Sequence, residues 1–348
     1  MKSQIKVGLV GYGMAAKVMH APFLHVSEDY EVTAVLERNR TESKALFPHA
    51  QIVRDLDALL QADCDLVVIT TPNDTHFPYA QKALMAGKHV VVEKPFTITT
   101  DEARLLIATA NQCKKVLSVY QNRRYVGDFL TMHSIISQGL LGDIHAFEGR
   151  YERYRPEPKP NAWREEPTAG SGILYDLGAH LIDQAQALFG MPVNVTADVR
   201  MQRPHARTDD YFDIQLDYGF NIVTLKASML VREQGPRYMI QGTKGSFIKY
   251  GEDPQEALLK EGIMPVSEDW GKEEPENYGL LHTEMNGEIV RMKYPTLQGS
   301  FGYFYRDLYD TIANGAPPKV TPEQAYNTIK LIELAFESSR EKRTIEVR

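Results

Sequence analysis

Short apolar runs alternate with helix-like segments over residues 1–121, and this alternation constrains the fold more than any other feature of the chain. The runs Leu66–Ile69 and Val90–Val92 are wholly apolar, as strands buried on both faces of a parallel sheet are. Amphipathic segments lie at Thr75–Ala86 and Asp101–Gln112. Strands that alternate with helices form βαβ units, so we predict an α/β fold with a doubly wound parallel sheet. The predicted strands are Ile5–Val10, Glu31–Leu36, Gln51–Val53, Leu66–Ile69, Val90–Val92 and Val116–Tyr120.

Beyond Gln121 the pattern changes to a succession of strands, many of which alternate apolar and polar residues, as in a sheet with one solvated face. Short turns between them predict an antiparallel meander, and Asn286-Gly287 is a hairpin signal. We therefore predict a second domain over residues 122–348, of α+β type, with a large, open, mainly antiparallel sheet. The stretch Gly251–Tyr278 is expected to be a long excursion. The predicted strands are Ala146–Tyr154, Val193–Met201, Asp213–Leu216, Asn221–Met229, Arg237–Gln241 and Ser246–Tyr250, and the helices are Phe129–Gln138, Leu177–Phe189 and Pro322–Arg340.

Composition narrows the class of protein. The 348 residues include 39 Lys and Arg against 46 Asp and Glu, a formal net charge of −7, which argues against a nucleic-acid partner because such binding rests on phosphate neutralisation. No apolar run approaches the ~20 residues that span a bilayer, and the first residues do not have the pattern of a signal peptide. The two cysteines, Cys64 and Cys113, have neither disulfide-framework nor metal-ligand spacing. We expect a cytoplasmic protein with no metal and no membrane partner.

A glycine motif follows the first predicted strand directly, because Gly11-x-Gly13-x-x-Ala16 fits G-x-G-x-x-A. In this motif Gly11 permits a tight turn, Gly13 lets a pyrophosphate approach the backbone, and Ala16 keeps the next helix close to the sheet. The N-terminus of that helix attracts phosphate. The match predicts a dinucleotide site that includes Met14 and Ala15, against the alternative of a purely structural glycine turn.

The end of the second predicted strand holds the residues that would choose between NAD and NADP. A carboxylate such as Glu37 binds the ribose hydroxyls and repels a 2′-phosphate, which favours NAD. Arg38 follows it and Arg40 is near, and these arginines either grip that phosphate or are solvated loop charges. The sequence favours NAD over NADP by a small margin.

Polar residues also follow the later strands. Thr71, Pro72 and Asn73 come directly after a buried strand, and strand C-termini line the ligand crevice of a doubly wound sheet, so we expect them to border the cofactor. Asn122 and Arg123 follow the last strand, where they are expected to contact the cofactor carboxamide, the substrate or the domain interface.

A charged pair, Glu93-Lys94, stands at the mouth of a buried strand. We expect Lys94 to point into the cleft where a nicotinamide would lie, where its ammonium can hydrogen-bond a substrate hydroxyl or move a proton. The alternative is a salt-bridged surface pair.

Asp176 and His180 form another candidate pair, because residues i and i+4 share a helix face and can converge on one substrate. The alternative is a helix cap or a satisfied surface pair. Planar rings suit the apolar faces of a sugar and guanidinium groups suit its hydroxyls. The candidate substrate-binding residues of this kind are Tyr154, Arg155, Trp163 and Tyr175.

These motifs, in this order, resemble the Gfo/Idh/MocA oxidoreductase family over nearly the whole chain. The resemblance rests on the glycine motif, on Thr71-Pro72-Asn73 with His76, on Glu93-Lys94-Pro95 and on Asp176-x-x-x-His180. It implies an N-terminal Rossmann domain, with His76 and Glu93 beside the cofactor, and a C-terminal domain whose open sheet forms contacts in a homodimer or homotetramer.

Within the family the chain is most similar to bacterial scyllo-inositol dehydrogenases, through segments such as Asn122-Arg123-Arg124 and Trp163-Arg164-Glu165. One departure concerns the cofactor. NADP-preferring relatives place Ser-Arg after the second strand, whereas this chain has Glu37-Arg38-Asn39. The resemblance therefore leaves the choice between NAD and NADP open.

The resemblance also implies the chemistry. Asp176 would hold a substrate hydroxyl, His180 would exchange the carbinol proton, and Lys94 would polarise the oxygen or act as the base. The expected reaction is hydride transfer between a secondary alcohol of a cyclic polyol or sugar and a nicotinamide. Two alternatives stay open, an NAD-dependent glycoside hydrolase that oxidises its sugar transiently and a non-catalytic regulator that senses nucleotide.

Overall fold

The structure is a computed structural model that describes residues 4–160 and 162–348, and it divides into two compact units. Each unit gathers segments that are distant in sequence, because the chain returns twice to the first unit. The first unit comprises Met1–Tyr125, Pro254–Gly271 and Ser300–Tyr326, and the second comprises Val126–Asp253, Lys272–Gly299 and Asn327–Arg348. The sequence-based division at residues 121 and 122 stays a prediction about which part binds which ligand.

A six-stranded parallel sheet with the order β3-β2-β1-β4-β5-β6 forms the core of the first unit. The order reverses between β1 and β4, and in such sheets ligands bind beyond the strand C-termini at that point. The wholly apolar runs are buried in the middle of this sheet, as predicted. The strands are β1 Ile5–Val10, β2 Tyr30–Leu36, β3 Gln51–Val53, β4 Leu66–Ile69, β5 His89–Val92 and β6 Leu117–Val119.

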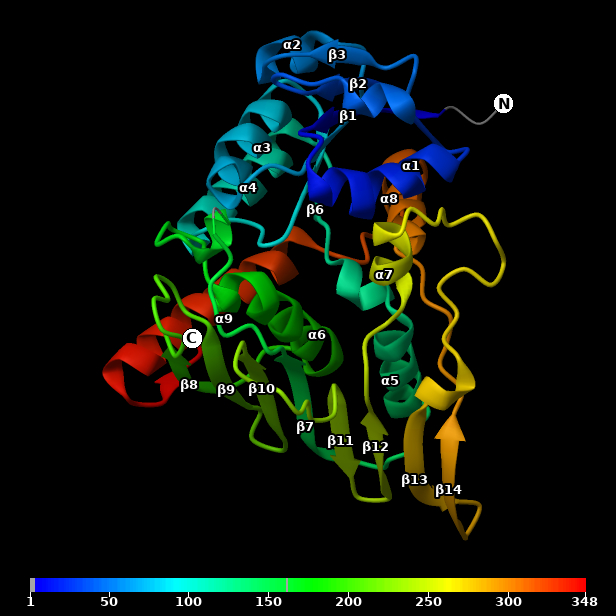
Figure 1. Ribbon diagram of the computed structural model, residues 1–348, viewed down its shortest axis with the longest axis vertical. Helices are drawn as coiled ribbons and strands as arrows, with labels where there is room; N and C mark the ends of the chain where they lie inside the picture. Colours follow the sequence, from blue (N-terminus) through cyan, green and yellow to red (C-terminus); the bar gives the residue numbers. More distant parts are fainter. Residues whose placement is uncertain (1–3, 161) are drawn as a thin grey trace. The chain divides into compact units, whose positions relative to one another are not determined.

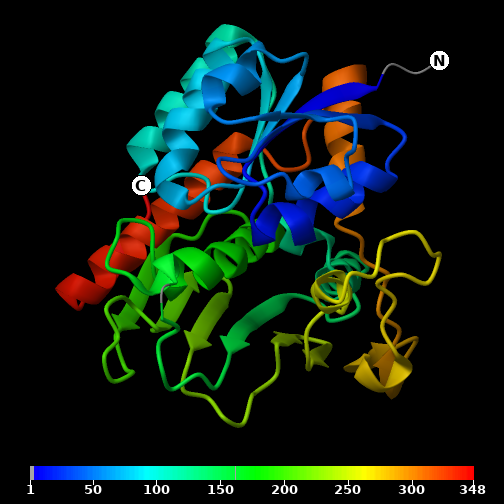
Figure 2. The same ribbon diagram turned by 45° about the horizontal axis from the view of Figure 1, so that its top comes forward.

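Helices cover both faces of this sheet, with α3 and α4 on one side and α1 and α8 on the other (Figures 1 and 2). Right-handed crossovers between parallel strands produce this arrangement. The sequence pattern does not predict α8, whose buried face includes Phe304, Tyr305 and Leu308. The helices are α1 Ala21–Val26, α2 Leu56–Gln61, α3 His76–Met85, α4 Thr100–Cys113, α7 Gln255–Lys260 and α8 Gly302–Asn314.

A nine-stranded sheet forms the second unit, with the order β14-β13-β12-β11-β7-β10-β9-β8-β15. It is mainly antiparallel, as predicted, but it is not one meander. β7 lies between β10 and β11 and pairs with β10 in parallel. The first strand of this sheet along the chain therefore lies in the middle of the sheet, and a long connection leads from it to the next strand. The strands are β7 Ile144–Glu152, β8 Asn194–Arg200, β9 Tyr211–Asp217, β10 Ile222–Ser228, β11 Tyr238–Gly242, β12 Gly245–Lys249, β13 Gly279–Met285, β14 Glu288–Tyr294 and β15 Ile345–Glu346.

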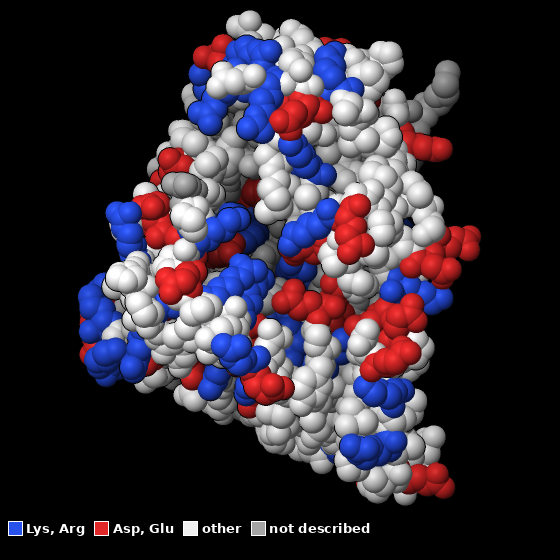
Figure 3. All heavy atoms as spheres, in the orientation of Figure 1, with Lys and Arg blue, Asp and Glu red and all other residues white. Residues whose placement is uncertain are grey.

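The predicted Asn-Gly hairpin is present between β13 and β14, where Asn286 and Gly287 both have positive φ values of 54° and 84°. Helix α6 lies along one face of the sheet (Figure 1). Among the described residues, no helix combines the length and hydropathy that a bilayer crossing requires. Figure 3 shows Lys and Arg side chains interspersed with Asp and Glu over one face. The helices of this unit are α5 Gly127–Ser137, α6 Ala179–Phe189 and, from residue 327 on, α9 Pro322–Glu341.

Candidate functional site

The glycine loop after β1 has the geometry of a phosphate cradle. Gly11 has a φ of +89°, and a Cβ there would lie 3.1 Å from Cγ2 of Thr71. A Cβ on Gly13 would meet nothing within 4 Å, so the space beside its backbone is open. Met14 and Ala15 begin the next helix, whose free N–H groups favour an anion. The loop therefore fits the pyrophosphate of a dinucleotide.

The helix after this loop contains a π turn over Ala16–His20, closed by the N–H of Ala21 on the carbonyl of Ala16. Pro22 explains the change of register, because it lacks the N–H that would bond the carbonyl of Val18 in a regular helix. The turn buries His20 completely. Ala16 is also fully buried, as close packing of the helix on the sheet requires.

Glu37 is buried at the end of β2, and its carboxylate is already engaged. Its Oε1 accepts from the backbone N–H of Ser43 at 3.0 Å and from the Ser43 hydroxyl at 2.5 Å, while Oε2 accepts from the N–H of Glu42 at 2.9 Å. A carboxylate has about four acceptor sites, so Oε2 keeps room for one more donor. Arg38 is exposed, and Arg40 is 74% exposed in an ion pair with Glu42.

His76 joins two loops at the C-terminal edge of the parallel sheet. Its Nδ1 lies 2.8 Å from the carbonyl oxygen of Pro95, and its Nε2 lies 2.9 Å from that of Thr71. Burial lowers the pKa of His76 against the opposing effect of these two carbonyls. Both ring nitrogens contact backbone carbonyls, so His76 positions the two loops that border the crevice. Asn73 is buried in the 3₁₀ turn Asn73–Thr75 between β4 and α3.

Glu93 is the centre of a buried polar cluster at the end of β5. Its Oε1 lies 2.7 Å from Nε2 of His20, and its Oε2 accepts from the backbone N–H of Lys94 at 3.1 Å. Burial alone would raise the pKa of Glu93, but His20 and then Lys94 hold it below its usual value. The carboxylate stays ionised beside Lys94, and its His20 contact was not foreseen from the sequence.

Asn122 and Arg123 lie in a buried 3₁₀ turn, Asn122–Tyr125. The guanidinium of Arg123 forms an ion pair with Glu256 on α7 and lies 5.9 Å from the ring centroid of Phe301. This ion pair lies within the first unit, and it lowers the pKa of Glu256 against the opposing effect of burial.

In the second unit, Asp176 and His180 lie on one continuous helical segment, but not in a regular α-helix. Residues Leu174–Gly178 form a π turn, closed by the N–H of Ala179 on the carbonyl of Leu174, and α6 follows. Because a π turn holds more residues than an α turn, the i, i+4 pair is offset from the shared face that the sequence predicts. Asp176 keeps a partly exposed side chain, whereas His180 is 6% exposed.

Arg164 holds Asp176 from a neighbouring loop. Its Nε lies 3.2 Å from Oδ1 of Asp176, and its guanidinium covers the Trp163 ring at 4.5 Å from the centroid. Arg164 thereby links the Trp163 ring to the Asp176 carboxylate. The sequence pattern predicts Trp163 as a substrate candidate and includes Arg164 only as part of the segment Trp163-Arg164-Glu165.

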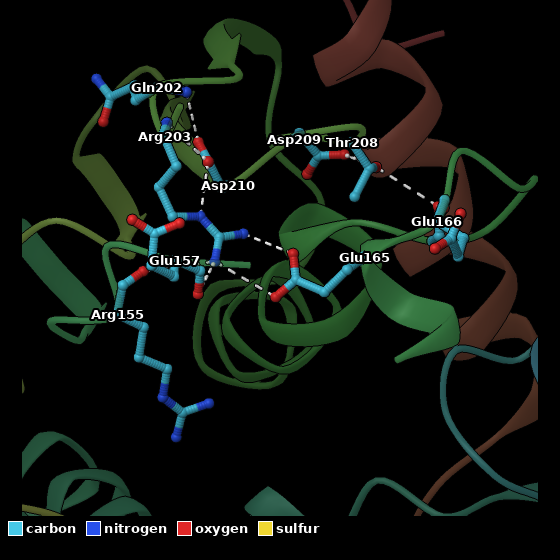
Figure 4. A network of polar contacts seen from close by, with 10 residues as sticks. Arg155, Glu157, Glu165, Glu166, Gln202, Arg203, Thr208, Asp209 and Asp210 are labelled. Atoms are coloured by element: carbon cyan, nitrogen blue, oxygen red, sulfur yellow. Dashed lines mark hydrogen bonds and ion pairs between the residues drawn. The ribbon is translucent and has the colours of Figure 1, made fainter. Parts of the chain in front are cut away.

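Figure 4 shows how a buried arginine anchors this loop. The guanidinium of Arg203, 2% exposed, pairs with Glu165 at 2.6 Å and with Asp210 at 2.9 Å. It also donates to the backbone carbonyls of Arg155 and Glu157. Arg203, in the turn after β8, therefore joins Asp210, directly before β9, to Glu165 and to the backbone at Arg155 and Glu157. No motif marks Arg203, because its partners are 7 to 48 residues away.

Asp209 holds the start of the helical segment. Its Oδ2 accepts from the N–H of Leu174 at 2.8 Å, and Oδ1 accepts from the Thr208 hydroxyl. Burial raises the pKa of Asp209 to about 6. A Cβ on Gly172 would lie only 1.9 Å from Oδ1 of Asp209, so the entrance to the segment requires glycine.

The other candidate residues for substrate have different surroundings. Tyr175 is buried, with its ring 6.0 Å from that of Phe336. Tyr154 is 44% exposed and lies under the guanidinium of Arg232, at 3.8 Å from the ring centroid. Arg155 is exposed beyond the end of β7. Of the four candidates, only Trp163 is linked by the described contacts to Asp176.

The two arrangements differ in the chemistry that they offer. The first unit offers an open glycine loop and a lysine, Lys94, whose backbone N–H is bonded to the Glu93 carboxylate. The second unit offers a carboxylate, an imidazole and an aromatic ring. Among the described residues no group of His, Cys, Asp and Glu side chains has the geometry of a metal site.

Comparison with known proteins gives the same result for both halves of the chain. Residues 5–121 match the NAD-binding Rossmann fold of the Gfo/Idh/MocA oxidoreductase family, and residues 133–347 match its C-terminal alpha/beta domain. The scyllo-inositol 2-dehydrogenase (NADP(+)) IolW of Bacillus subtilis (strain 168) is 43% identical over 342 residues, which cover 98% of this chain and 95% of that protein. The oxidoreductase YdgJ of Escherichia coli (strain K12) is 41% identical over 346 residues, 99% of each chain. The solved structure of the oxidoreductase YvaA from Bacillus subtilis superposes with a TM-score of 0.97 at 42% identity and covers 100% of this chain and 99% of that one.

Proposed function

Because the chain belongs to the Gfo/Idh/MocA oxidoreductase family and carries its NAD(P)-binding Rossmann domain, we propose that it oxidises or reduces one hydroxyl-bearing carbon of a cyclic polyol or sugar. When bound, the nicotinamide accepts or gives the hydride. In this proposal residues 1–121 bind the nucleotide and residues 122–348 bind the substrate.

The observation that carries the substrate half is the setting of Asp176. A carboxylate on a partly exposed π turn, paired with Arg164 and linked through it to the Trp163 ring, is suited to accept hydrogen bonds from the vicinal hydroxyls of a ring that rests on the indole. The scyllo-inositol dehydrogenase IolW, 43% identical, supports an inositol-like substrate.

The protein's own groups have three roles in this proposal. Asp176 orients the substrate by one hydroxyl. His180 accepts the carbinol proton at a ring nitrogen in the oxidation direction and returns it in the reduction direction. Lys94 stabilises the developing negative charge on the carbinol oxygen, while Glu93 fixes the backbone at which this lysine stands.

The test is a panel of inositol isomers and aldoses, each with NAD⁺ and with NADP⁺, followed by the absorbance of the reduced cofactor. We expect turnover with at least one cyclic polyol or sugar. His180→Ala and Lys94→Ala should each lower kcat by about 10²–10⁴-fold while the dissociation constant of the nucleotide changes little. Near-normal turnover in both variants would refute the assigned roles.

Two further results would redirect the proposal. Release of an aglycone from a glycoside without accumulation of reduced cofactor would indicate the glycoside hydrolase. Nucleotide binding without turnover across the whole panel would indicate the regulator.

We further propose that the protein works in the cytoplasm as a homodimer or homotetramer. Light scattering of the purified protein would measure the oligomeric state.

A further inference from the structure

The first unit contains a buried chain of polar side chains that the proposed reaction leaves unexplained. The hydroxyl of Tyr305 lies 2.5 Å from Nδ1 of His20, and Nε2 of the same ring lies 2.7 Å from Oε1 of Glu93. The other oxygen of Glu93 accepts from the N–H of Lys94. Three segments meet here, since the π turn, the end of β5 and α8 each contribute one of the three side chains.

The protonation states along this chain follow from burial and charge. An ionised carboxylate only accepts hydrogen bonds, so Nε2 of His20 is the donor in its contact with Glu93. Burial raises the pKa of Tyr305 well above its usual value, so its hydroxyl keeps its proton. The Tyr305 hydroxyl can therefore donate to Nδ1 of His20, and this hydrogen bond orients the ring.

Among the described contacts, His20 is the side-chain donor to this carboxylate oxygen. The groups that face the cluster are the ring of Tyr120, which stacks on His20 at 4.1 Å between centroids, and the charged or titratable groups of Lys94 and His76, which also lower the pKa of Glu93. A buried carboxylate without a hydrogen-bond donor takes up a proton instead of staying ionised.

We propose that His20 is a positioning residue for Lys94, which acts through Glu93 and is itself oriented by Tyr305. A protonated Glu93 loses its charge beside Lys94 and accepts less strongly from the Lys94 N–H. The inference rests on the proposed function, because it assigns His20 to the reaction that Lys94 serves.

Four variants of the full-length protein test it. His20→Leu removes the donor, His20→Gln keeps an N–H, and Tyr305→Phe removes only the hydroxyl that orients the ring. The matched control is Tyr30→Phe, because the Tyr30 hydroxyl is also buried but donates to the backbone carbonyl of Tyr305 at 2.7 Å. Each variant is assayed for kcat/KM from pH 5 to pH 9, for nucleotide affinity and for thermal unfolding.

The expected result follows from the sign of the Glu93 shift. Without His20 the pKa of Glu93 rises. As the pH is lowered, Glu93 then takes up its proton earlier, and the activity that needs the ionised carboxylate is lost at a higher pH than in the unaltered protein. His20→Leu should therefore move the acid limb of the profile upward and lower kcat/KM about 10–100-fold, the effect of losing a hydrogen bond to a charged group. Tyr305→Phe should move it less, His20→Gln should largely restore it, and Tyr30→Phe should lower only the unfolding temperature.

An unchanged pH profile in His20→Leu, or equal profiles in Tyr305→Phe and Tyr30→Phe, would overturn the inference. Infrared spectra separate this outcome from a failure of the proposed function, because they need no substrate. The band of a protonated carboxyl should appear at a higher pH in His20→Leu than in the unaltered protein, and Glu93→Gln should remove it. The same titration of this band in both proteins would also refute the role of His20.

Discussion

Arg38 and Glu37 differ in what they can still offer a cofactor. The carboxylate of Glu37 is largely occupied by Ser43 and Glu42, whereas the guanidinium of Arg38 is exposed. The sequence alone does not show whether Glu37 or Arg38 binds the ribose. The hydrogen bonds of Glu37 to its own loop decide how many of its acceptor sites remain for ribose hydroxyls.

We therefore expect Arg38→Ala to raise the KM for NADP⁺ about 10–100-fold and to leave that for NAD⁺ nearly unchanged, since only a 2′-phosphate needs the arginine. Arg40→Ala is the matched control, because Arg40 is exposed and already paired with Glu42. Equal effects of Arg38→Ala on the two cofactors would argue against a phosphate contact.

Asp209 carries a proton-linked cost. Its folded pKa of about 6 exceeds the ordinary value of 3.8, so the stability linked to this proton is present below about pH 4 and is lost as the pH rises through about 6. Asp209→Asn keeps an acceptor for the Leu174 N–H and removes the charge. Between pH 4.5 and pH 7, we expect the free energy of unfolding of the variant to rise by about 1–3 kcal/mol relative to that of the unaltered protein. Urea unfolding at both pH values measures this difference, which should vanish if Asp209 titrates normally.

At the scale of elements, the sequence predicts what lies within one segment and misses what joins segments. The β1–glycine loop–helix motif and the buried β4 and β5 are local patterns, and the structure contains them at the expected residues. The position of β7 beside β10 is not local, because strand pairing depends on contacts across 70 residues or more. The π turns are also missed, although Pro22 marks one of them.

The segment 155–165 depends on Arg203 in the same long-range way. Arg203→Met would leave the buried carboxylate of Asp210 and the partly buried one of Glu165 without their cation, so we expect a loss of roughly 3–5 kcal/mol in the free energy of unfolding. The loop that carries Arg164 would loosen, so KM for the substrate should rise more than kcat falls.

Arg203→Lys separates the two effects. A lysine keeps the charge but lacks the planar fork of donors that lets Arg203 reach Glu165 and Asp210 together, so stability should recover in part while KM stays high. Denaturant unfolding and steady-state kinetics on the same preparations provide both numbers. A normal KM in Arg203→Met would show that the loop position does not depend on this anchor.

At the scale of the whole molecule, the two compact units have their own cores and are linked by several crossings of the chain. Sequence patterns identify both sheets but place one cut between them, because the returns of Pro254–Gly271 and Ser300–Tyr326 to the first unit depend on tertiary packing. The segment Ser300–Tyr326 matters for function in our proposal, since it supplies Tyr305.

Nucleotide binding should therefore be visible in the stability of the whole chain. At 100 times its dissociation constant the cofactor stabilises the folded protein by about 2.7 kcal/mol, which raises the unfolding temperature by several degrees. Gly13→Val tests whether this occurs at the glycine loop. A Cβ there would meet nothing within 4 Å, so we expect the variant without cofactor to unfold near the normal temperature. With cofactor the rise should disappear, because the valine occupies the space that the pyrophosphate needs. A full rise in Gly13→Val would place the nucleotide elsewhere.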